Sequence, residues 1–321
     1  MKKMLMIIVL QSLVLSAIGQ VTEIEAKLKP KPVAPDTIQG WKKGGTITTN
    51  FSQVSLTNWA SGGQNSLALN GLLSLFGHYK KGKGNWENYL DIAYGTIRQG
   101  KKSNWWKSDD KIDFTSKYGR RATGDWYLAG VLNFKTQMAD GFNYPNDSLV
   151  ISKLMAPGYL LGALGMDYKP NDKFTMFFAP LTSKTTFVSD RELANAGNFG
   201  VTPAVYDTAG NVITPGKNVR GEFGGYIRIF YKRDIVENIT LQTKLDLFSN
   251  YLHNPQNIDV NWETLISMKV NKYISATLST HLLYDDDIDI AFDSNNDGVK
   301  DKKGPRTQFK EALGVGFSYK F

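Results

Sequence analysis

Phe309-Lys310-Glu311-Ala312-Leu313-Gly314-Val315-Gly316-Phe317-Ser318-Tyr319-Lys320-Phe321 is the stretch that decides the fold. Its odd-numbered positions are large and apolar except for Glu311, and its even-numbered positions are small or charged. Because side chains alternate between the two faces of a β-strand, one face of this strand is apolar and the other is small or polar. Apolar groups facing outward and polar groups facing inward are typical of a strand in a transmembrane β-barrel. Phe321, which ends the aromatic face, also resembles the terminal signal read by barrel-insertion machinery.

The same alternation recurs along the chain in runs of about ten residues or more, a length that suits a tilted membrane crossing. We predict about twelve strands, near residues 44–54, 66–79, 86–99, 111–121, 126–138, 158–168, 173–183, 219–231, 239–250, 258–270, 273–285 and 308–321. The expected fold class is all-β, a transmembrane antiparallel up-and-down barrel. A water-soluble β-sandwich also alternates, but its strands are usually shorter.

The connections between these strands alternate in length. Short turns are expected at 80–85, 122–125, 169–172, 232–238 and 271–272, and longer loops at 55–65, 100–110, 139–157, 184–218, 251–257 and 286–307. Outer-membrane barrels place short turns in the periplasm and long loops outside, so an even strand count puts both termini in the periplasm. Within the longest loop, residues 190–197 carry a short helix signal ended by glycine.

The first residues predict export. Lys2 and Lys3 precede an apolar run over residues 4–18, and Ala17-Ile18-Gly19 supplies small residues for cleavage before Gln20. We therefore expect a signal peptide at 1–19, a Pro-rich periplasmic linker at 20–40 and an outer-membrane barrel at 41–321. The chain has no cysteine, so packing or sheet closure, rather than disulfides, must hold the exported protein together.

Composition narrows the class of protein further. Hydrophobic residues make up 41% of the chain and charged residues 21%, which excludes a disordered protein. No later segment is apolar for long enough to form a membrane helix, so a membrane-spanning fold must be a closed barrel. The net charge of +8 comes from scattered lysine and arginine residues, which argues against nucleic acid as a partner.

Aromatic and charged residues have expected places in such a barrel. Interfacial girdles of aromatic side chains are expected from Trp86, Trp126, Trp262, Tyr159, Tyr319 and Phe321. Charges of both signs are expected to face the lumen at Lys244, Asp246, Asp259, Glu263, Lys269, Lys310 and Lys320. These charges can cross-link the interior by ion pairs or line a narrow solute path, and the strand count does not choose between the two.

Several stretches resemble an uncharacterised family of outer-membrane β-barrel proteins of Gram-negative bacteria, known only as a domain of unknown function. The resemblance covers roughly residues 40–321 and lies in the segments 55–63, 142–148, 167–170, 179–184, 222–226, 254–263 and 268–273. It implies an outer-membrane location, with outer-membrane lipid as the surrounding partner. It implies no catalytic or ligand-binding residue.

One loop matches part of a calcium-binding motif. Asp293, Asn295 and Asp297 occupy positions 1, 3 and 5, Gly298 occupies position 6 and Asp301 occupies position 9. Short oxygen side chains at alternate positions can surround a hard cation, but position 12 lacks the bidentate glutamate of an EF-hand. A polar surface turn gives the same residues, so Ca²⁺ in the loop 293–301 is a hypothesis.

A second candidate site contains His281, which shares the inward face with Asp285 and Asp287. A histidine beside carboxylates can act as a general base, which suggests an outer-membrane hydrolase acting on lipid or peptide. A lumen-facing polar residue in a hydrogen-bonded plug is the favoured alternative.

The predicted function is therefore a non-enzymatic outer-membrane barrel, without catalytic residues or a required cofactor. Such a barrel would serve as a narrow pore or as an accessory subunit of an outer-membrane transport or assembly complex. The second role would involve outer-membrane or periplasmic protein partners that contact the external loops and the linker.

Overall fold

The computed structural model describes residues 39–55, 64–100, 104–144, 146–271, 274–295 and 301–320. Twelve long strands form one closed antiparallel ring. They are β1 (Gly40–Val54), β2 (Ser66–Lys81), β3 (Gly84–Gln99), β4 (Trp106–Thr123), β5 (Trp126–Thr136), β8 (Gly158–Tyr168), β9 (Phe174–Phe187), β12 (Val219–Val236), β13 (Ile239–Asn250), β14 (Ile258–Lys269), β15 (Ile274–Tyr284) and β18 (Gln308–Lys320).

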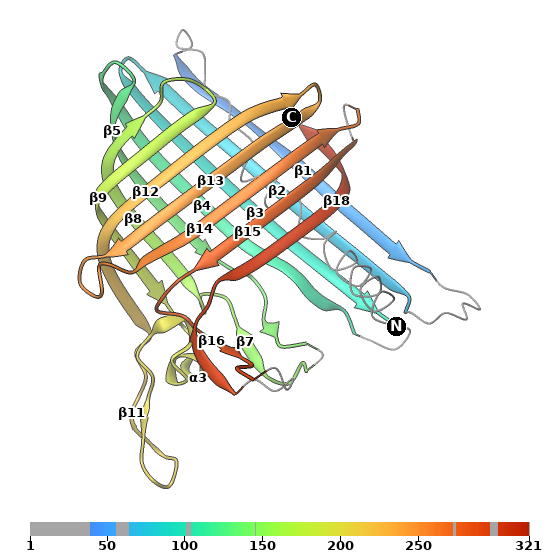
Figure 1. Cartoon of the computed structure of the whole chain (residues 1–321), viewed down its shortest axis with the longest axis vertical. Helices are drawn as coiled ribbons and strands as arrows, with labels where there is room; N and C mark the ends of the chain where they lie inside the picture. Colours follow the sequence, from blue (N-terminus) through green and yellow to red (C-terminus); the bar gives the residue numbers. More distant parts are fainter. Residues whose placement is uncertain are drawn as a thin grey trace.

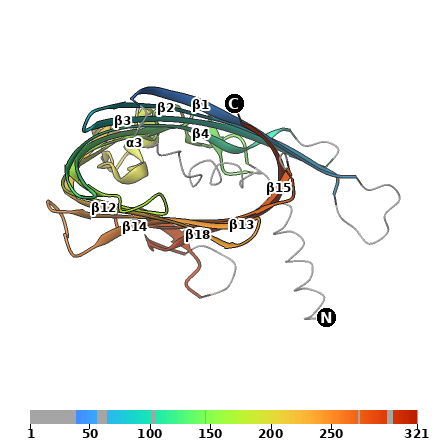
Figure 2. The same cartoon turned by 90° about the horizontal axis from the view of Figure 1, so that it is seen from above.

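The order of strands around the ring follows their order in the chain, which confirms the predicted up-and-down barrel. The first and last strands close it, because β1 pairs with β18 from Thr46↔Lys320 to Thr49↔Phe317. Seen from above, the ring is flattened (Figure 2). All twelve predicted strands are present. The expected signal peptide 1–19 lies outside the described residues, as does the linker 20–40 apart from its last two residues.

Two strands extend well beyond their predicted ends. β4 begins at Trp106, which pairs with Ile97 beyond a bulge at Ser108 of β4, and β12 ends at Val236, which pairs with Ile239 across a tight turn. In both cases the ladder of backbone hydrogen bonds continues past the alternating segment. Hairpin geometry, rather than side-chain pattern, therefore sets these strand ends.

Long and short connections lie at opposite ends of the barrel (Figure 1). At the lower end of the figure, here called the loop end, the long connections carry α3 (Arg191–Asn195), η1 (Asn198–Gly200) and three small hairpins. The hairpins are β6 (Gly141–Phe142) with β7 (Val150–Ser152), β10 (Val205–Tyr206) with β11 (Val212–Thr214), and β16 (Asp289–Phe292) with β17 (Lys302–Pro305). The other end of the barrel, here called the turn end, holds the short turns, the start of β1 and the end of β18.

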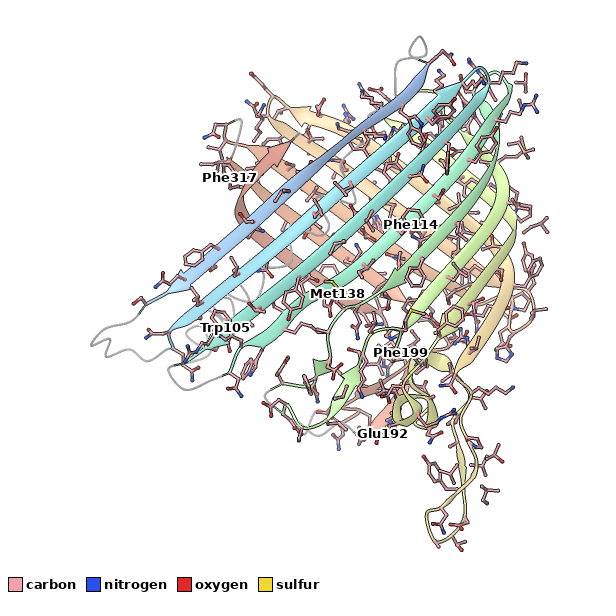
Figure 3. All side chains as sticks on the ribbon, turned by 180° about the vertical axis from the view of Figure 1, so that it is seen from behind. Trp105, Phe114, Met138, Glu192, Phe199 and Phe317 are labelled. Carbon is pink, nitrogen blue, oxygen red and sulfur yellow. The ribbon has the colours of Figure 1, made fainter. Side chains whose placement is uncertain are left out.

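Side chains alternate between an apolar outer surface and a polar or small inner surface. On β5, Leu128 and Leu132 are 64% and 47% exposed. The residue that follows each of them, Ala129 or Asn133, is buried. Phe317 of β18, labelled in Figure 3, is 49% exposed, as the outward face of the terminal stretch requires. Water-soluble monomers rarely expose such broad apolar surface, whereas a barrel in lipid requires it. Among the residues that the structure describes, no helix is long and apolar enough to cross a membrane.

Aromatic side chains gather at the turn end. The ring centroid of Trp41 lies 5.2 Å from that of Tyr79 and 5.7 Å from that of Trp86, and Trp126 lies 4.7 Å from Tyr168. These contacts place the predicted residues Trp86 and Trp126 in aromatic clusters at the short turns, where an interfacial girdle is expected.

The girdle prediction is wrong for Tyr159, because this residue pairs with the buried Thr186 and so shares its inward face. Trp262 does face outward, and its indole Nε1 donates to Thr243 Oγ1 at 2.8 Å. Phe321 lies outside the described residues, and the side chain of Tyr319 is not described.

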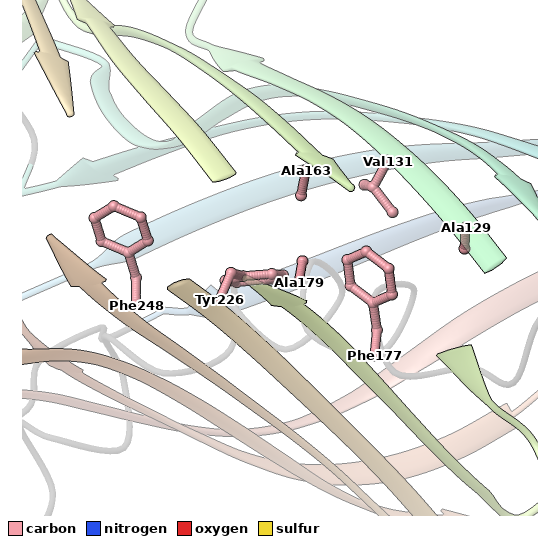
Figure 4. Packing of buried hydrophobic residues seen from close by; sticks show 7 residues of the cluster. All are labelled: Ala129, Val131, Ala163, Phe177, Ala179, Tyr226 and Phe248. Atoms are coloured by element: carbon pink, nitrogen blue, oxygen red, sulfur yellow. The ribbon is translucent and has the colours of Figure 1, made fainter. Parts of the chain in front are cut away.

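Part of the lumen is filled by an apolar cluster from β5, β8, β9, β12 and β13 (Figure 4). Phe177 and Tyr226 meet edge to face at 6.3 Å, and Phe248 lies in the same group. Small residues on the facing strands, such as Ala163, leave room for these rings. This cluster fills one part of the lumen with apolar side chains, and the charged side chains described below occupy other parts of it.

Candidate functional site in the lumen

Buried ion pairs join neighbouring strands in the middle of the lumen wall. Arg228 Nε and Nη2 donate to Asp246 Oδ1 and Oδ2 at 2.6 and 3.0 Å, and the Tyr226 hydroxyl donates to the same carboxylate at 2.9 Å. Lys244 Nζ donates to Glu263, which is fully buried, at 2.9 Å. Charged groups shielded from water need such partners, so these pairs fix the inward side chains.

A second group of charges lies nearer the loop end and is here called the outer-mouth cluster. Lys184 Nζ lies 2.9 Å from Asp259, 3.5 Å from Asp285 and 3.6 Å from Glu222. Two strands lie between β9, which carries Lys184, and β14, which carries Asp259, so this lysine spans part of the lumen.

Arg220 completes the outer-mouth cluster, with distances of 2.7 Å to Glu222 and 2.8 Å to Asp287. The cluster therefore contains two cations and four carboxylates, a net charge of −2 at neutral pH. An acidic mouth of this kind raises the local concentration of cations and lowers that of anions.

A third group, the inner network, lies near the turn end. Lys117 lies 2.5 Å from Asp167 and 3.9 Å from Glu87, while Lys169 lies 3.1 Å from Asp167 and 3.0 Å from Glu87. Two cations and two carboxylates thus balance. Because Glu87 belongs to β3 and Lys169 follows β8, the network joins parts of the ring separated by two strands.

A small cap at the loop end has its own apolar core. Ala156, Val188, Leu193, Ala194 and Val201 are buried together, with Phe199 packed against them. Figure 2 shows α3 within the outline of the barrel, and Figure 3 labels Glu192 and Phe199 in this cap. The cap is residues 153–157 together with residues 188–218.

Polar contacts order the cap internally, and one of them joins it to the barrel. Asp190 accepts hydrogen bonds from Glu192 N and Leu193 N at 3.0 Å, which caps α3. A hydrogen bond from Lys153 Nζ at 2.7 Å lowers the pKa of the Asp190 carboxyl group and raises the pKa of Lys153. Arg220 Nη1 donates to Gly200 O at 3.4 Å, so one arginine contacts both the cap and the outer-mouth cluster.

The predicted site around His281 takes a different form. His281 Nε2 lies 2.9 Å from Asn261 Oδ1, while Asp285 lies beside Lys184 and Asp287 beside Arg220. Asp285 and Asp287 are therefore each paired with a cation, and the partner of His281 at this distance is an amide oxygen rather than a carboxylate. These contacts favour a structural role for His281 over the hydrolase alternative.

The candidate calcium loop is described only in part, because Asp297 lies outside the described residues. Ser294 N and Oγ donate to the two oxygens of Asp301 at 2.7 and 2.6 Å, and Asn295 N donates to Asp293 Oδ1 at 3.1 Å. These hydrogen bonds join the two described ends of the connection between β16 and β17. In the described ranges no group of three or more carboxylate or histidine side chains is placed to hold a metal ion. Calcium binding by the loop stays a prediction.

Several charged residues of the lumen were not predicted from the sequence. The expected inward residues Lys244, Asp246, Asp259 and Glu263 are present in ion pairs, but their partners Lys184 and Arg228 were missed. So were Arg220, Glu222 and the inner network. Apart from Lys169, which follows β8, each of these residues sits on the inward face of an alternating strand, and that position was the available signal.

A closed twelve-strand barrel with an apolar outer surface, aromatic clusters at its turn end and a charged interior defines an outer-membrane β-barrel protein. A family model described as "Protein of unknown function (DUF3078)" matches residues 51–142, from β1 to β6. This match confirms the family resemblance over that part of the chain. No curated protein matches the sequence.

Solved structures similar to this chain include outer-membrane barrels at low identity. An outer membrane channel from Pseudomonas putida F1 is 10% identical, with 90% of this chain and 100% of that chain covered and a TM-score of 0.40. The translocator domain of the autotransporter NalP from Neisseria meningitidis is 10% identical, with 94% of each chain covered and a TM-score of 0.36. Outer membrane phospholipase A from Escherichia coli is 11% identical, with 93% and 98% covered and a TM-score of 0.35. These likenesses are too distant to support a functional conclusion.

Proposed function

We propose that this protein is a non-enzymatic, narrow pore of the outer membrane, and that ion pairs across the lumen hold this pore in a closed conformation. The observation that carries the proposal is the outer-mouth cluster, in which Lys184 reaches from β9 to Asp259 on β14. A lysine in this position both narrows the mouth and neutralises its carboxylates. The cap contacts the same cluster through Arg220, so movement of the cap and opening of the mouth would be coupled.

Conductance in planar bilayers tests this proposal. We expect wild-type protein to give rare, small, discrete current steps, and Lys184→Met to give more frequent and more cation-selective steps, because four carboxylates then face a single arginine. Lys302→Met, on the exposed strand β17, is the matched control and should behave like wild type. Silent bilayers for all three proteins would contradict the pore.

An accessory subunit is the second candidate function, and one observation favours it. The β10–β11 hairpin projects away from the barrel (Figure 1) and exposes Val205, Tyr206, Val212 and Ile213. Exposed aliphatic and aromatic side chains on a projecting hairpin are typical of a protein contact. Silent bilayers, together with a membrane-protein partner that co-purifies with wild type but not with Ile213→Ser, would favour this role.

A further inference from the structure

An open groove of about 570 Å³ crosses the outer wall of the barrel over β4, β5, β8, β9 and β12, and is here called the wall groove. Its rim consists of exposed apolar and aromatic side chains, which are Tyr118, Leu132, Leu164, Leu181 and Phe223. Gly162 pairs in register with Leu132 on one side and with Ser183 on the other, so all three share the outward face. A Cβ atom added to Gly162 would meet no heavy atom within 4 Å, so the floor of the groove is open there.

The wall groove slants through the apolar band of the barrel. Phe174, at the start of β9, belongs to the same turn-end aromatic cluster as Trp126, because both rings contact Tyr168. Leu132 lies six residues from Trp126 on β5, and Ser183 lies nine residues from Phe174 on β9. With about 3.3 Å per residue and a tilt of about 45°, these positions are about 14 and 20 Å from the cluster along the membrane normal. In a band about 25 Å tall, the groove therefore runs from near the midplane to near the loop-end boundary.

An aromatic pair marks the loop-end limit of the wall groove. Phe223 pairs in register with Ser183, and its ring centroid lies 6.2 Å from that of Tyr251, which follows β13. Aromatic side chains gather where the hydrocarbon of a bilayer meets its headgroups. The ester groups of phospholipids, which join acyl chains to headgroups, lie at the same boundary. Ser183 is therefore at the depth of the ester carbonyl groups.

The two serines that line the wall groove differ in their hydrogen bonds. Ser116 Oγ accepts from Trp86 Nε1 at 2.9 Å and donates to Asn88 Oδ1 at 2.8 Å. The Ser183 hydroxyl has no hydrogen-bond partner in the parts of the chain that the structure describes. A hydroxyl group in hydrocarbon costs free energy unless it is hydrogen-bonded. An acceptor from outside the chain would remove this cost at Ser183.

We propose that the wall groove binds one ester-linked acyl chain of a phospholipid in the leaflet at the loop end. Ser183 Oγ donates to the ester carbonyl oxygen, and the chain runs along the groove past Gly162 toward Leu132. The groove is continuous with the lipid-facing surface, so acyl chains rather than water fill it, and its volume lies within the range of small-molecule sites. Binding does not require conduction, so the site goes beyond the proposed pore.

Competition between two lipids for the full chain in detergent tests this site. Native mass spectrometry would compare retention of dipalmitoyl phosphatidylcholine with that of its dihexadecyl ether analogue, which lacks the carbonyl groups, when both are offered in equal amounts. We expect wild type to prefer the ester lipid by about fivefold, the effect of one hydrogen bond. Ser183→Ala should abolish the preference, because it removes the donor. Gly162→Leu should also abolish it, because the new side chain fills the floor and keeps the chain away from Ser183.

Gly71→Leu is the matched control. Gly71 lies on β2, outside the groove, and pairs with the exposed Tyr94, and an added Cβ there would also meet no heavy atom within 4 Å. This variant should keep the preference of wild type, as should Ser183→Thr, which retains a hydroxyl group. All these substitutions lie on the outer face, so the barrel should fold, which circular dichroism would verify. A diazirine at the end of the acyl chain should label peptides that carry Tyr118 rather than Phe223.

Equal retention of the two lipids by wild type would overturn the proposal. A preference that survives Ser183→Ala, or an equal loss of preference in Gly71→Leu, would also overturn it. An oligomer of wild type that Gly162→Leu dissociates, without any preference for the ester lipid, would show a contact between copies of this chain instead. None of these readouts depends on current through the barrel, so failure of the pore proposal would leave this test intact.

Discussion

Replacing Leu132 with arginine is expected to lower the free energy of unfolding of the membrane-embedded barrel by about 2–4 kcal/mol, the cost of a cation near the middle of the bilayer. Leu132 faces outward on β5, six residues from Trp126 in the turn-end aromatic cluster. With about 3.3 Å per residue and a strand tilt of about 45°, it lies about 14 Å from that cluster along the membrane normal. An apolar band about 25 Å tall then places it near the midplane.

Urea unfolding of protein folded into phospholipid vesicles, followed by tryptophan fluorescence, measures this effect. Leu252→Arg is the matched control, because Leu252 is 72% exposed in the loop between β13 and β14. The control should change stability by no more than about 0.5 kcal/mol, as surface substitutions usually do. Equal effects of the two substitutions would mean that β5 does not face lipid at Leu132.

The second large effect is expected from Arg228→Met, which should destabilise the barrel by about 3–5 kcal/mol, because it leaves the Asp246 carboxylate buried without its guanidinium partner. Both hydrogen bonds of the bidentate pair would be lost, and Lys244 is already bound to Glu263. The same urea titration gives the change in free energy of unfolding.

A double variant separates loss of the pair from loss of packing. Arg228→Met/Asp246→Leu removes both charges and should recover most of the stability, since an apolar pair needs no partner for a buried charge. If the double variant were as unstable as the sum of the two single variants, the two side chains would act independently, and the ion pair would not hold this part of the wall.

Much of the fold could be predicted from the sequence because one physical rule applies at every strand. In lipid each strand must present apolar groups outward, and a one-residue slip would reverse every side chain. The rule holds at Phe309 and Phe317 of β18, which are 63% and 49% exposed, and it even carries the polar Glu311 outward. Tyr159 was misplaced because an aromatic residue near a strand end was assigned by type rather than by its pairing with Thr186.

The site was less predictable, because alternation shows which side chains face the lumen but not which of them meet. Lys184 and Asp259 are 75 residues apart in the chain, and Lys169 and Glu87 are 82 apart. Whether such residues come within reach depends on the stagger of the strands and on the flattening of the ring, neither of which a single sequence pattern determines. The cap was partly predictable, since Asp190 and Gly197 mark the ends of α3, but its contact with Arg220 was not.

Closure of the ring by β1 and β18 is the central claim, and disulfide trapping between these strands tests it most directly. The chain has no cysteine, so Thr48→Cys/Ser318→Cys introduces the only two thiols, at positions that pair in register. Paired residues in neighbouring strands lie close enough to form a disulfide, so oxidation in membranes should give an intramolecular crosslink with altered gel mobility. Thr48→Cys/Glu311→Cys, displaced by seven residues along β18, should give none. A crosslink in the displaced pair, or between two chains instead of within one, would contradict the closed twelve-strand barrel.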